Sequence, residues 1–183
     1  MSEFWETLED KDIALDAILT GYQGSVEDMP VYPEVTKYLN NTGSILDFGC
    51  GAGRNLAYLK DEYSQVYGYD YPNMLKFVSR ETLAKGNVTI TSDWGFISNH
   101  QYDEILFSLV LQHIHVDELR DILRRLSLCS RRFIIHSRTW IDFTFEDILP
   151  VLEEFFVIDS IEYDKDPNSN ENDHFIGVFE PRR

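Results

Sequence analysis

Ser44-Ile-Leu-Asp-Phe-Gly-Cys-Gly-Ala-Gly-Arg-Asn55 is the stretch on which the interpretation of this chain depends. Its apolar residues Ile45, Leu46 and Phe48 predict the end of a buried strand. Three glycines then alternate with other residues, and a helical pattern of apolar residues begins at Leu56. A strand, a glycine turn and a helix form a cradle for a nucleotide-like ligand, because glycine lets the backbone come close and the helix start offers free N–H groups.

The spacing of the glycines narrows the kind of ligand. A dinucleotide-binding turn follows G-x-G-x-x-G, but here the third glycine comes one residue early, at Gly53, and Arg54 takes its place. A phosphate-binding P-loop needs Gly-Lys-Ser/Thr, which the stretch lacks. A glycine-rich turn in an unrelated α/β protein is the alternative that the spacing leaves open.

Asp47, Gly49, Gly51 and Gly53 resemble motif I, D/E-x-G-x-G-x-G, of the class I methyltransferases that use S-adenosylmethionine (SAM). An acidic residue before the turn suits a cofactor with an ammonium group, whereas it would repel a pyrophosphate. The resemblance covers about residues 44–180 and points to the small, free-standing type. It implies an α/β fold whose doubly wound, seven-stranded sheet is mostly parallel, with an antiparallel last strand and helices on both faces.

The pattern of apolar residues along the chain fits one domain over residues 1–183, with a helical lid at 1–40 and a SAM-binding core at 44–180. Strands are expected at 44–48, 66–70, 87–91, 102–115 (with its exit), 133–137, 156–163 and 174–180. Helices are expected at 3–19, 33–39, 54–63, from 71, at 116–126 and from 144. Pro150 should kink or restart the last helix. Residues 126–132 lack the glycine turn that the family places before its fifth strand.

Several cofactor-binding residues follow from the resemblance. Asp70 ends the second strand, where an acid can accept two hydrogen bonds from a ribose diol, although dinucleotide sites share this feature. Tyr71 and Met74 would flank the adenine, and Asp93 would accept a hydrogen bond from its amino group, with Trp94 packed on the ring. Core packing of Met74 and helix capping by Asp93 are the alternatives. The remaining members of the expected set are Cys50, Asn55 and Ser108.

The substrate that receives the methyl group, the acceptor, is expected to bind where strands four and five end. His113 follows strand four and is the first candidate to contact substrate or take a proton, as a general base would. His136 and Tyr22 are further candidates for substrate binding, and both His115 and His136 are weaker candidates than His113. Each of these side chains has a purely structural alternative, as a pocket wall or a packing residue.

Composition limits the partners. The 183 residues carry a formal net charge of −16, which argues against a broad nucleic-acid footprint and hints at an amine or another cation as acceptor. The acidic start lacks a signal-peptide pattern, and the longest apolar run, 105–111, is too short to span a membrane. Cys50 and Cys129 show no metal-ligand spacing. We therefore expect a cytoplasmic protein with reduced thiols and no metal.

These observations predict a SAM-dependent methyltransferase that acts on a small molecule, in which placing nucleophile and methyl group in line supplies much of the rate. The family's Asn/Asp-Pro-Pro-Tyr/Phe turn after strand four is absent, and so is a Pro-Cys nucleophile. Three alternatives stay open. They are a SAM-binding partner protein without methyl transfer, an enzyme that methylates a protein or RNA, and a nicotinamide-dependent reductase. The sequence leaves the methylated atom and the oligomeric state open.

Overall fold

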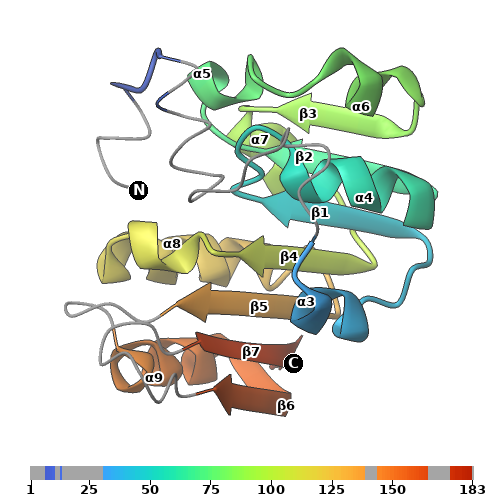
Figure 1. Ribbon diagram of the computed structural model, residues 1–183. Helices are drawn as coiled ribbons and strands as arrows, with labels where there is room; N and C mark the ends of the chain where they lie inside the picture. The colour runs from blue at the N-terminus through green and yellow to red at the C-terminus, as the bar shows by residue number, and fades with distance from the viewer. Residues whose placement is uncertain (1–6, 11–12, 14–30, 139–143, 165–173, 183) are drawn as a thin grey trace.

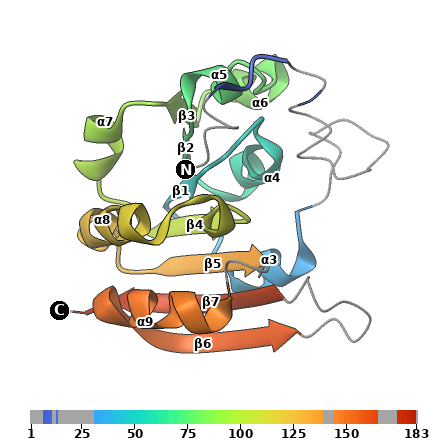
Figure 2. The same ribbon diagram turned by 90° about the vertical axis from the view of Figure 1, so that its left-hand side faces the viewer.

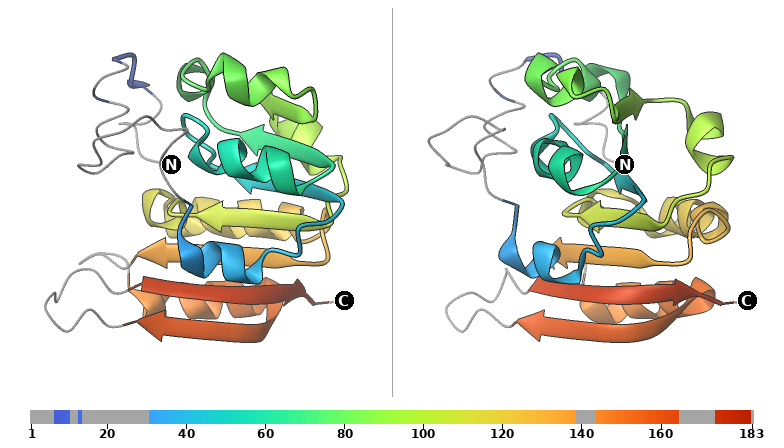
Figure 3. Two further views of the ribbon diagram at one scale, coloured as in Figure 1. Left: turned by 45° about the vertical axis from the view of Figure 1, so that its right-hand side comes forward. Right: turned by 90° about the vertical axis from the view of Figure 1, so that its right-hand side faces the viewer.

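The computed structural model describes residues 7–10, 13, 31–138, 144–164 and 174–182, which Figure 1 draws as coloured ribbons. Their centre is a seven-stranded sheet in the order β3-β2-β1-β4-β5-β7-β6. Strands β1 to β5 pair in parallel, and β7 runs antiparallel to both β5 and β6 (Figure 3). The strands are β1 (Ser44–Phe48), β2 (Gln65–Tyr69), β3 (Val88–Thr91), β4 (Glu104–Ser108), β5 (Phe133–Arg138), β6 (Phe156–Asp164) and β7 (His174–Pro181). The expected fold class is therefore confirmed.

Helices cover both faces of the sheet, as Figure 2 shows for α3 and α4 on one side and α7 and α8 on the other. The first face carries α3 (Pro33–Tyr38), α4 (Arg54–Glu62), α5 (Pro72–Leu75) and α6 (Arg80–Ala84). The second face carries α7 (Trp94–Ser98), α8 (Val116–Leu126) and α9 (Phe145–Phe155). A short 3-10 helix, η1 (Leu111–His113), follows β4. No helix in the described part of the chain is long and apolar enough to cross a membrane.

The two faces of the sheet bury alternate residues of the central strands. On β1, Ile45 packs with α3 and α4, whereas Leu46 and Phe48 pack with the helices of the second face. Every residue of β4 is buried, as expected for a parallel strand covered on both sides. The same alternation decides which side chains reach the first face at the carboxyl ends of the strands, where the site lies.

At the amino ends of the central strands, opposite the carboxyl ends where the candidate site lies, an ion pair with a buried carboxylate stabilises the fold. Glu104, at the start of β4, is 1% exposed and pairs with Arg132. Its carboxylate also accepts hydrogen bonds from the Tyr63 hydroxyl and from the Asn40 backbone N–H, the latter at 3.1 Å. Arg132 donates to the Tyr38 carbonyl at 2.5 Å. This network ties α3 and its following loop to the sheet.

Three local expectations have different outcomes. Helix α9 continues through Pro150, so the expected restart does not occur. Before β5, where the family's glycine turn is missing, the Ser130 hydroxyl donates to Asp103 O at 3.2 Å and accepts from Arg132 N at 3.2 Å. These side-chain hydrogen bonds take the place of a glycine-based turn.

Most of the expected helix at 3–19 and of the lid at 1–40 lies outside the described residues. Residues 8–10 are described and are not helical, so one continuous helix over 3–19 was wrong. Asp10 Oδ1 accepts a hydrogen bond from Ile13 N at 3.1 Å, the kind of side-chain contact that caps the start of a helix.

Candidate functional site

The glycine turn after β1 closes against the end of β2. The backbone N–H groups of Gly49 and Cys50 both donate to the Tyr69 carbonyl, at 2.8 and 3.1 Å. Gly49 has φ +74°, and a Cβ there would lie 2.9 Å from the Cβ of Val110 and closer still to its Cγ2. Gly53, with φ +92°, is the N-cap of α4. The predicted cradle of strand, glycine turn and helix is therefore present, and it needs glycine at residue 49 for conformation and space alike.

Asp47 and Asn55 form a buried pair beside this turn. Asn55 Nδ2 donates to Asp47 Oδ1 at 3.1 Å. Within the described part of the chain, Asp47 Oδ2 and Asn55 Oδ1 are buried and receive no hydrogen bond. Burial raises the pKa of Asp47 to about 7, although the Asn55 hydrogen bond and the charge of Arg54 act in the opposite direction. Two buried acceptors without donors suit a ligand that brings a positively charged donor group.

Asp70 lies across from the glycine turn, as the sequence predicted. Its Oδ2 accepts from the N–H of Gly51 and its Oδ1 from the N–H of Tyr71, both at 2.7 Å. Burial raises the pKa of this carboxyl, while the two backbone hydrogen bonds lower it. Each carboxylate oxygen has a second lone pair, so the carboxylate is held in place and can still accept hydrogen bonds from a diol.

Of the residues expected around the adenine, Met74 and Asp93 show the structural roles that the sequence left as alternatives. Met74 is 1% exposed and packs in a cluster with Leu8. Asp93 caps α7, where its Oδ1 accepts from the N–H groups of Gly95 and Phe96. Trp94 packs edge-on against Phe48 and Tyr69, at the ends of β1 and β2. Contacts of Met74, Asp93 and Trp94 with a cofactor stay a prediction.

The histidines expected on the acceptor side differ in their surroundings. His113, in η1 just after β4, is half-buried, and burial lowers the pKa of its imidazole. It is therefore neutral at pH 7 and able to accept a proton. His115 caps α8 and its side chain is 80% exposed. Tyr22 lies outside the described residues.

His136 lies on the first face of the sheet, among other aromatic and polar side chains. It is 2% exposed, and its ring centroid is 4.9 Å from that of Tyr32 and 5.7 Å from that of His174. Ser108 Oγ lies 3.5 Å from His136 Nδ1. Ser108, which was expected to bind the cofactor, therefore lies beside a residue expected to bind the substrate. Burial, followed by the charges of His174, Arg54 and Arg138, lowers the pKa of His136 to about 3. His136 is therefore a neutral group at physiological pH.

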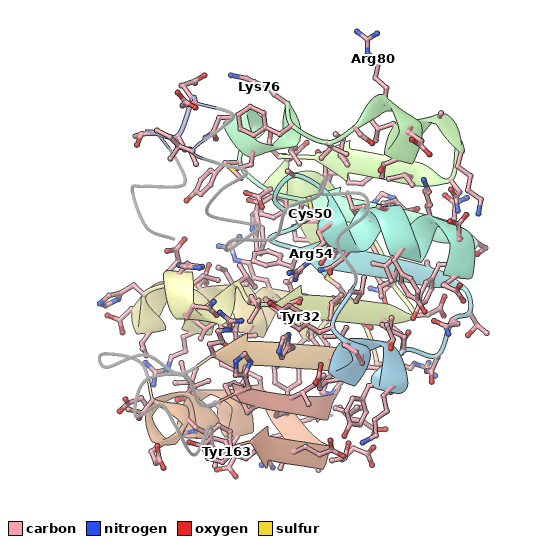
Figure 4. All side chains as sticks on the ribbon, viewed as in Figure 1. Tyr32, Cys50, Arg54, Lys76, Arg80 and Tyr163 are labelled. Atoms are coloured by element: carbon pink, nitrogen blue, oxygen red, sulfur yellow. The ribbon has the colours of Figure 1, made fainter. Side chains whose placement is uncertain are left out.

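The predicted cofactor residues Asp47, Gly49, Cys50, Gly51, Gly53, Asn55, Asp70 and Tyr71 gather around one turn. The sequence prediction did not include Arg54 and Arg138, whose side chains both contact Tyr32. Figure 4 shows Arg54 and Tyr32 next to each other. A signal for Arg138 was present in β5, because His136 and Arg138 continue the alternate positions of buried Ile134 toward the carboxyl end of the strand. No group of three or more potential metal ligands is clustered within the described ranges.

Comparison with known proteins identifies a methyltransferase domain. The family model described as "Methyltransferase domain" matches residues 29–136. No curated protein matches the chain.

Many solved structures share the fold. A SAM-dependent methyltransferase of Leishmania major superposes with a TM-score of 0.72 at 14% identity, over 97% of this chain and 80% of the other. A TehB-like SAM-dependent methyltransferase of Corynebacterium glutamicum gives 0.66 at 20% identity, over 85% and 90%. Magnesium protoporphyrin IX methyltransferase of Synechocystis PCC 6803, with bound SAM, gives 0.62 at 20% identity, over 94% and 98%.

Proposed function

The chain belongs to the methyltransferase domain family, and we propose that it transfers the methyl group of SAM to a small-molecule acceptor. The observation that carries this proposal is the pair of buried acceptors, Asp47 Oδ2 and Asn55 Oδ1, that receive no hydrogen bond from any described residue. They lie beside a glycine turn through which a ligand can approach the backbone. An ammonium group with three donors fits such a place.

The residues present fit the cofactor. Asp47 and Asn55 would hold its ammonium group, and Asp70, fixed by the N–H groups of Gly51 and Tyr71, would accept hydrogen bonds from its ribose. When bound, SAM would supply an electrophilic methyl group, which passes in line to the nucleophilic atom of the acceptor as the methyl–sulfur bond breaks and S-adenosylhomocysteine is left as the thioether. The protein therefore has to hold the acceptor in line and keep the approach of the two reactants fixed.

The acceptor would be held at the exits of β4 and β5. Ser108 and His136 are both buried there, and His113 is half-buried. Side chains with so little exposed surface can be contacted by a small molecule or a narrow group, but not by the broad surface of a folded macromolecule, which supports a small-molecule acceptor.

We assign His113 the role of general base where the acceptor carries a proton. Its imidazole has a pKa below the ordinary 6.5 because of burial, so the neutral form is available at pH 7 without prior loss of a proton. The pH profile of acceptor methylation should then fall on the acidic side, below pH 6.5. His136, whose pKa is still lower, would contact the acceptor as a neutral group.

The test combines cofactor binding with label transfer. Calorimetry with SAM and with S-adenosylhomocysteine measures binding, and methyl-labelled SAM with fractionated metabolites, peptides and RNA identifies the acceptor class. The proposal predicts binding of both nucleosides and label in the metabolite fraction. His113→Asn should reduce transfer while leaving nucleoside binding unchanged. His100→Asn is the matched control, because His100 stacks on Phe96 beside α7 and away from the acceptor residues.

Each outcome has a distinct meaning. Failure of well-folded protein to bind either nucleoside would refute the cofactor assignment. Binding without transfer to any fraction would favour a SAM-binding partner protein, and label in the peptide or RNA fraction would move the acceptor to a macromolecule. Equal turnover by the wild type and His113→Asn would remove the proposed base.

A further inference from the structure

The register of the sheet gathers basic side chains at one corner of the site. His136 and Arg138 are two residues apart on β5 and so project from the same face as Ile134. In the antiparallel pairing of β5 with β7, Arg138 lies directly opposite His174. Residues directly opposite each other on neighbouring strands have adjacent side chains. Two histidines and an arginine therefore share one face of the sheet.

Tyr32 connects this corner with the glycine turn. The guanidinium carbon of Arg54, the first residue of α4, lies 4.7 Å from the centroid of its ring. The centroid of the His136 ring lies 4.9 Å from the same point. The Tyr32 hydroxyl accepts a hydrogen bond from Arg138 Nη2 at 3.3 Å. Tyr32 thus holds Arg54, His136 and Arg138 around one point, which we call the basic corner: Tyr32, Arg54, His136, Arg138 and His174.

Among the residues of the basic corner, Arg138 gives the evidence for a ligand. Its Nε is buried and donates no hydrogen bond to any residue that the structure describes. Within the same ranges no carboxylate forms an ion pair with it, whereas Arg132, which is also partly buried, pairs with Glu104. A buried guanidinium N–H without an acceptor is unfavourable, because it has lost its water.

We propose that the methyl acceptor carries an anionic group, a carboxylate or a phosphate, and that Arg138 binds it within the basic corner. This inference rests on the proposed function, because it names the class of acceptor for the same site. The edge of a guanidinium formed by Nε and a neighbouring Nη matches two oxygens of either group. Arg54 contributes positive charge, and neutral His136 contributes a polar wall that also contacts the acceptor.

An anionic acceptor is the opposite of the cationic acceptor that the net charge of the chain suggested. A net charge of −16 favours a cationic acceptor if the charge is treated as evenly spread. The local arrangement differs, because Arg54 and Arg138 lie close to one tyrosine and both lower the pKa of the buried His136. At contact distances inside a protein, such local charges outweigh distant surface charges, which salt screens.

Binding of simple anions tests the inference without knowledge of the acceptor. Protein labelled with 13C in its histidine rings and saturated with S-adenosylhomocysteine is titrated with sodium acetate and, separately, with sodium phosphate at constant pH and ionic strength. The expected result is a saturable shift of the His136 and His174 signals by at least one anion. Comparison of the two titrations shows whether carboxylate or phosphate is preferred.

Variants assign the effect to Arg138. Arg138→Gln should weaken anion binding about tenfold or more, because a charged hydrogen-bonding partner is lost. Arg138→Lys keeps the charge but removes the planar edge, and should give an intermediate affinity. If Arg138→Gln does not fold, Arg138→Lys alone carries the comparison. Arg120→Gln is the matched control, since Arg120 is exposed and pairs with Glu154. It should bind the anions as the wild type does.

The outcomes separate this inference from the proposed function. Histidine signals unmoved by either anion, or moved equally in the wild type and the Arg138 variants, would overturn the inference. Faster label transfer to neutral primary carboxamides than to their parent carboxylic acids, unaffected by Arg138→Gln, would also overturn it while leaving methyl transfer established. Loss of nucleoside binding, by contrast, would refute the proposed function, and the anion titrations of the unliganded protein would still decide whether the basic corner binds anions.

Discussion

Replacing Asp47 by asparagine should make the stability of the unliganded protein less dependent on pH and should weaken cofactor binding. Asp47 is fully buried, and its pKa is raised from an ordinary 3.8 to about 7, mainly by burial. This difference of about 3.2, at 1.36 kcal/mol per pKa unit, corresponds to about 4 kcal/mol. Because the folded pKa lies above the unfolded one, the stabilisation is fully present below about pH 4 and is lost as the pH rises through about 7.

Chemical unfolding measures this loss directly. The isoelectric point is about 4.5, so the useful range is about pH 5.5 to pH 8.5, in which roughly half of the total, about 2 kcal/mol, is expected to disappear from the wild type. The variant lacks the carboxyl and should show a flatter curve. Its new amide does not titrate, so any change in hydrogen bonding that it brings shifts the free energy of unfolding equally at every pH. The diagnostic quantity is therefore the change with pH and not the absolute difference.

Cofactor binding should respond in the opposite direction. The ionised Asp47 attracts an ammonium group, so binding of S-adenosylhomocysteine by the wild type should tighten as the pH rises toward about 7 and should release a proton below that value. Asp47→Asn should lose the affinity and the proton release together. Asp61→Asn is the matched control, because Asp61 is exposed on α4 and its pKa is lowered by Lys85. Parallel unfolding curves for the wild type and Asp47→Asn would refute the reasoning.

Three further predictions concern the turn and its supports. Gly49→Ala should lower the free energy of unfolding by about 1–3 kcal/mol and weaken nucleoside binding. Gly86→Ala, where φ is also positive but no atom lies within 4 Å, should leave nucleoside binding unchanged in calorimetry. Arg132→Met should cost about 3–5 kcal/mol in chemical unfolding, because buried Glu104 loses its cationic partner; a loss below 1 kcal/mol would contradict this. Cys50 should react with iodoacetamide far more slowly in folded than in unfolded protein, because burial raises the pKa of its thiol. Peptide mass mapping measures the two rates, and equal rates would contradict its burial.

The parts of the structure that depend on local spacing could be predicted from the sequence. The bounds of β1 agree with the expected strand at 44–48, because its apolar run and the following glycines mark both its burial and its end. The position of Asp70 opposite the turn also followed, because consecutive parallel strands end at the same edge of a sheet. In these cases the determining residues lie close together in the chain.

The features that depend on long-range register could not be predicted. Arg138 and His174 are neighbours only because β7 returns antiparallel beside β5, and no local pattern fixes which residue stands opposite which. Ser130 replaces a glycine turn through bonds to Asp103 and Arg132, and a serine in a polar stretch gives no sign of this. Pro150 was expected to kink or restart its helix, and the helix continues through it without a restart. Capping by Asp93 was open as an alternative, and the structure shows it.

The first two residues of α4 lie between the two proposed halves of the site, one for the cofactor's ammonium group and one for an anionic acceptor. Asn55 contacts Asp47, whereas Arg54 lies over Tyr32 in the basic corner. Successive residues of a helix point about 100° apart, so adjacent positions serve the two sides. Arg54 also favours the ionised form of Asp47 and lowers the pKa of His136. The positive charge of Arg54, which would attract an anionic acceptor, therefore also favours the ionised Asp47 that would bind the cofactor's ammonium group. The one-residue displacement of the third glycine, which places arginine at residue 54, thus does more than exclude a dinucleotide, since it supplies the charge between the two halves of the site.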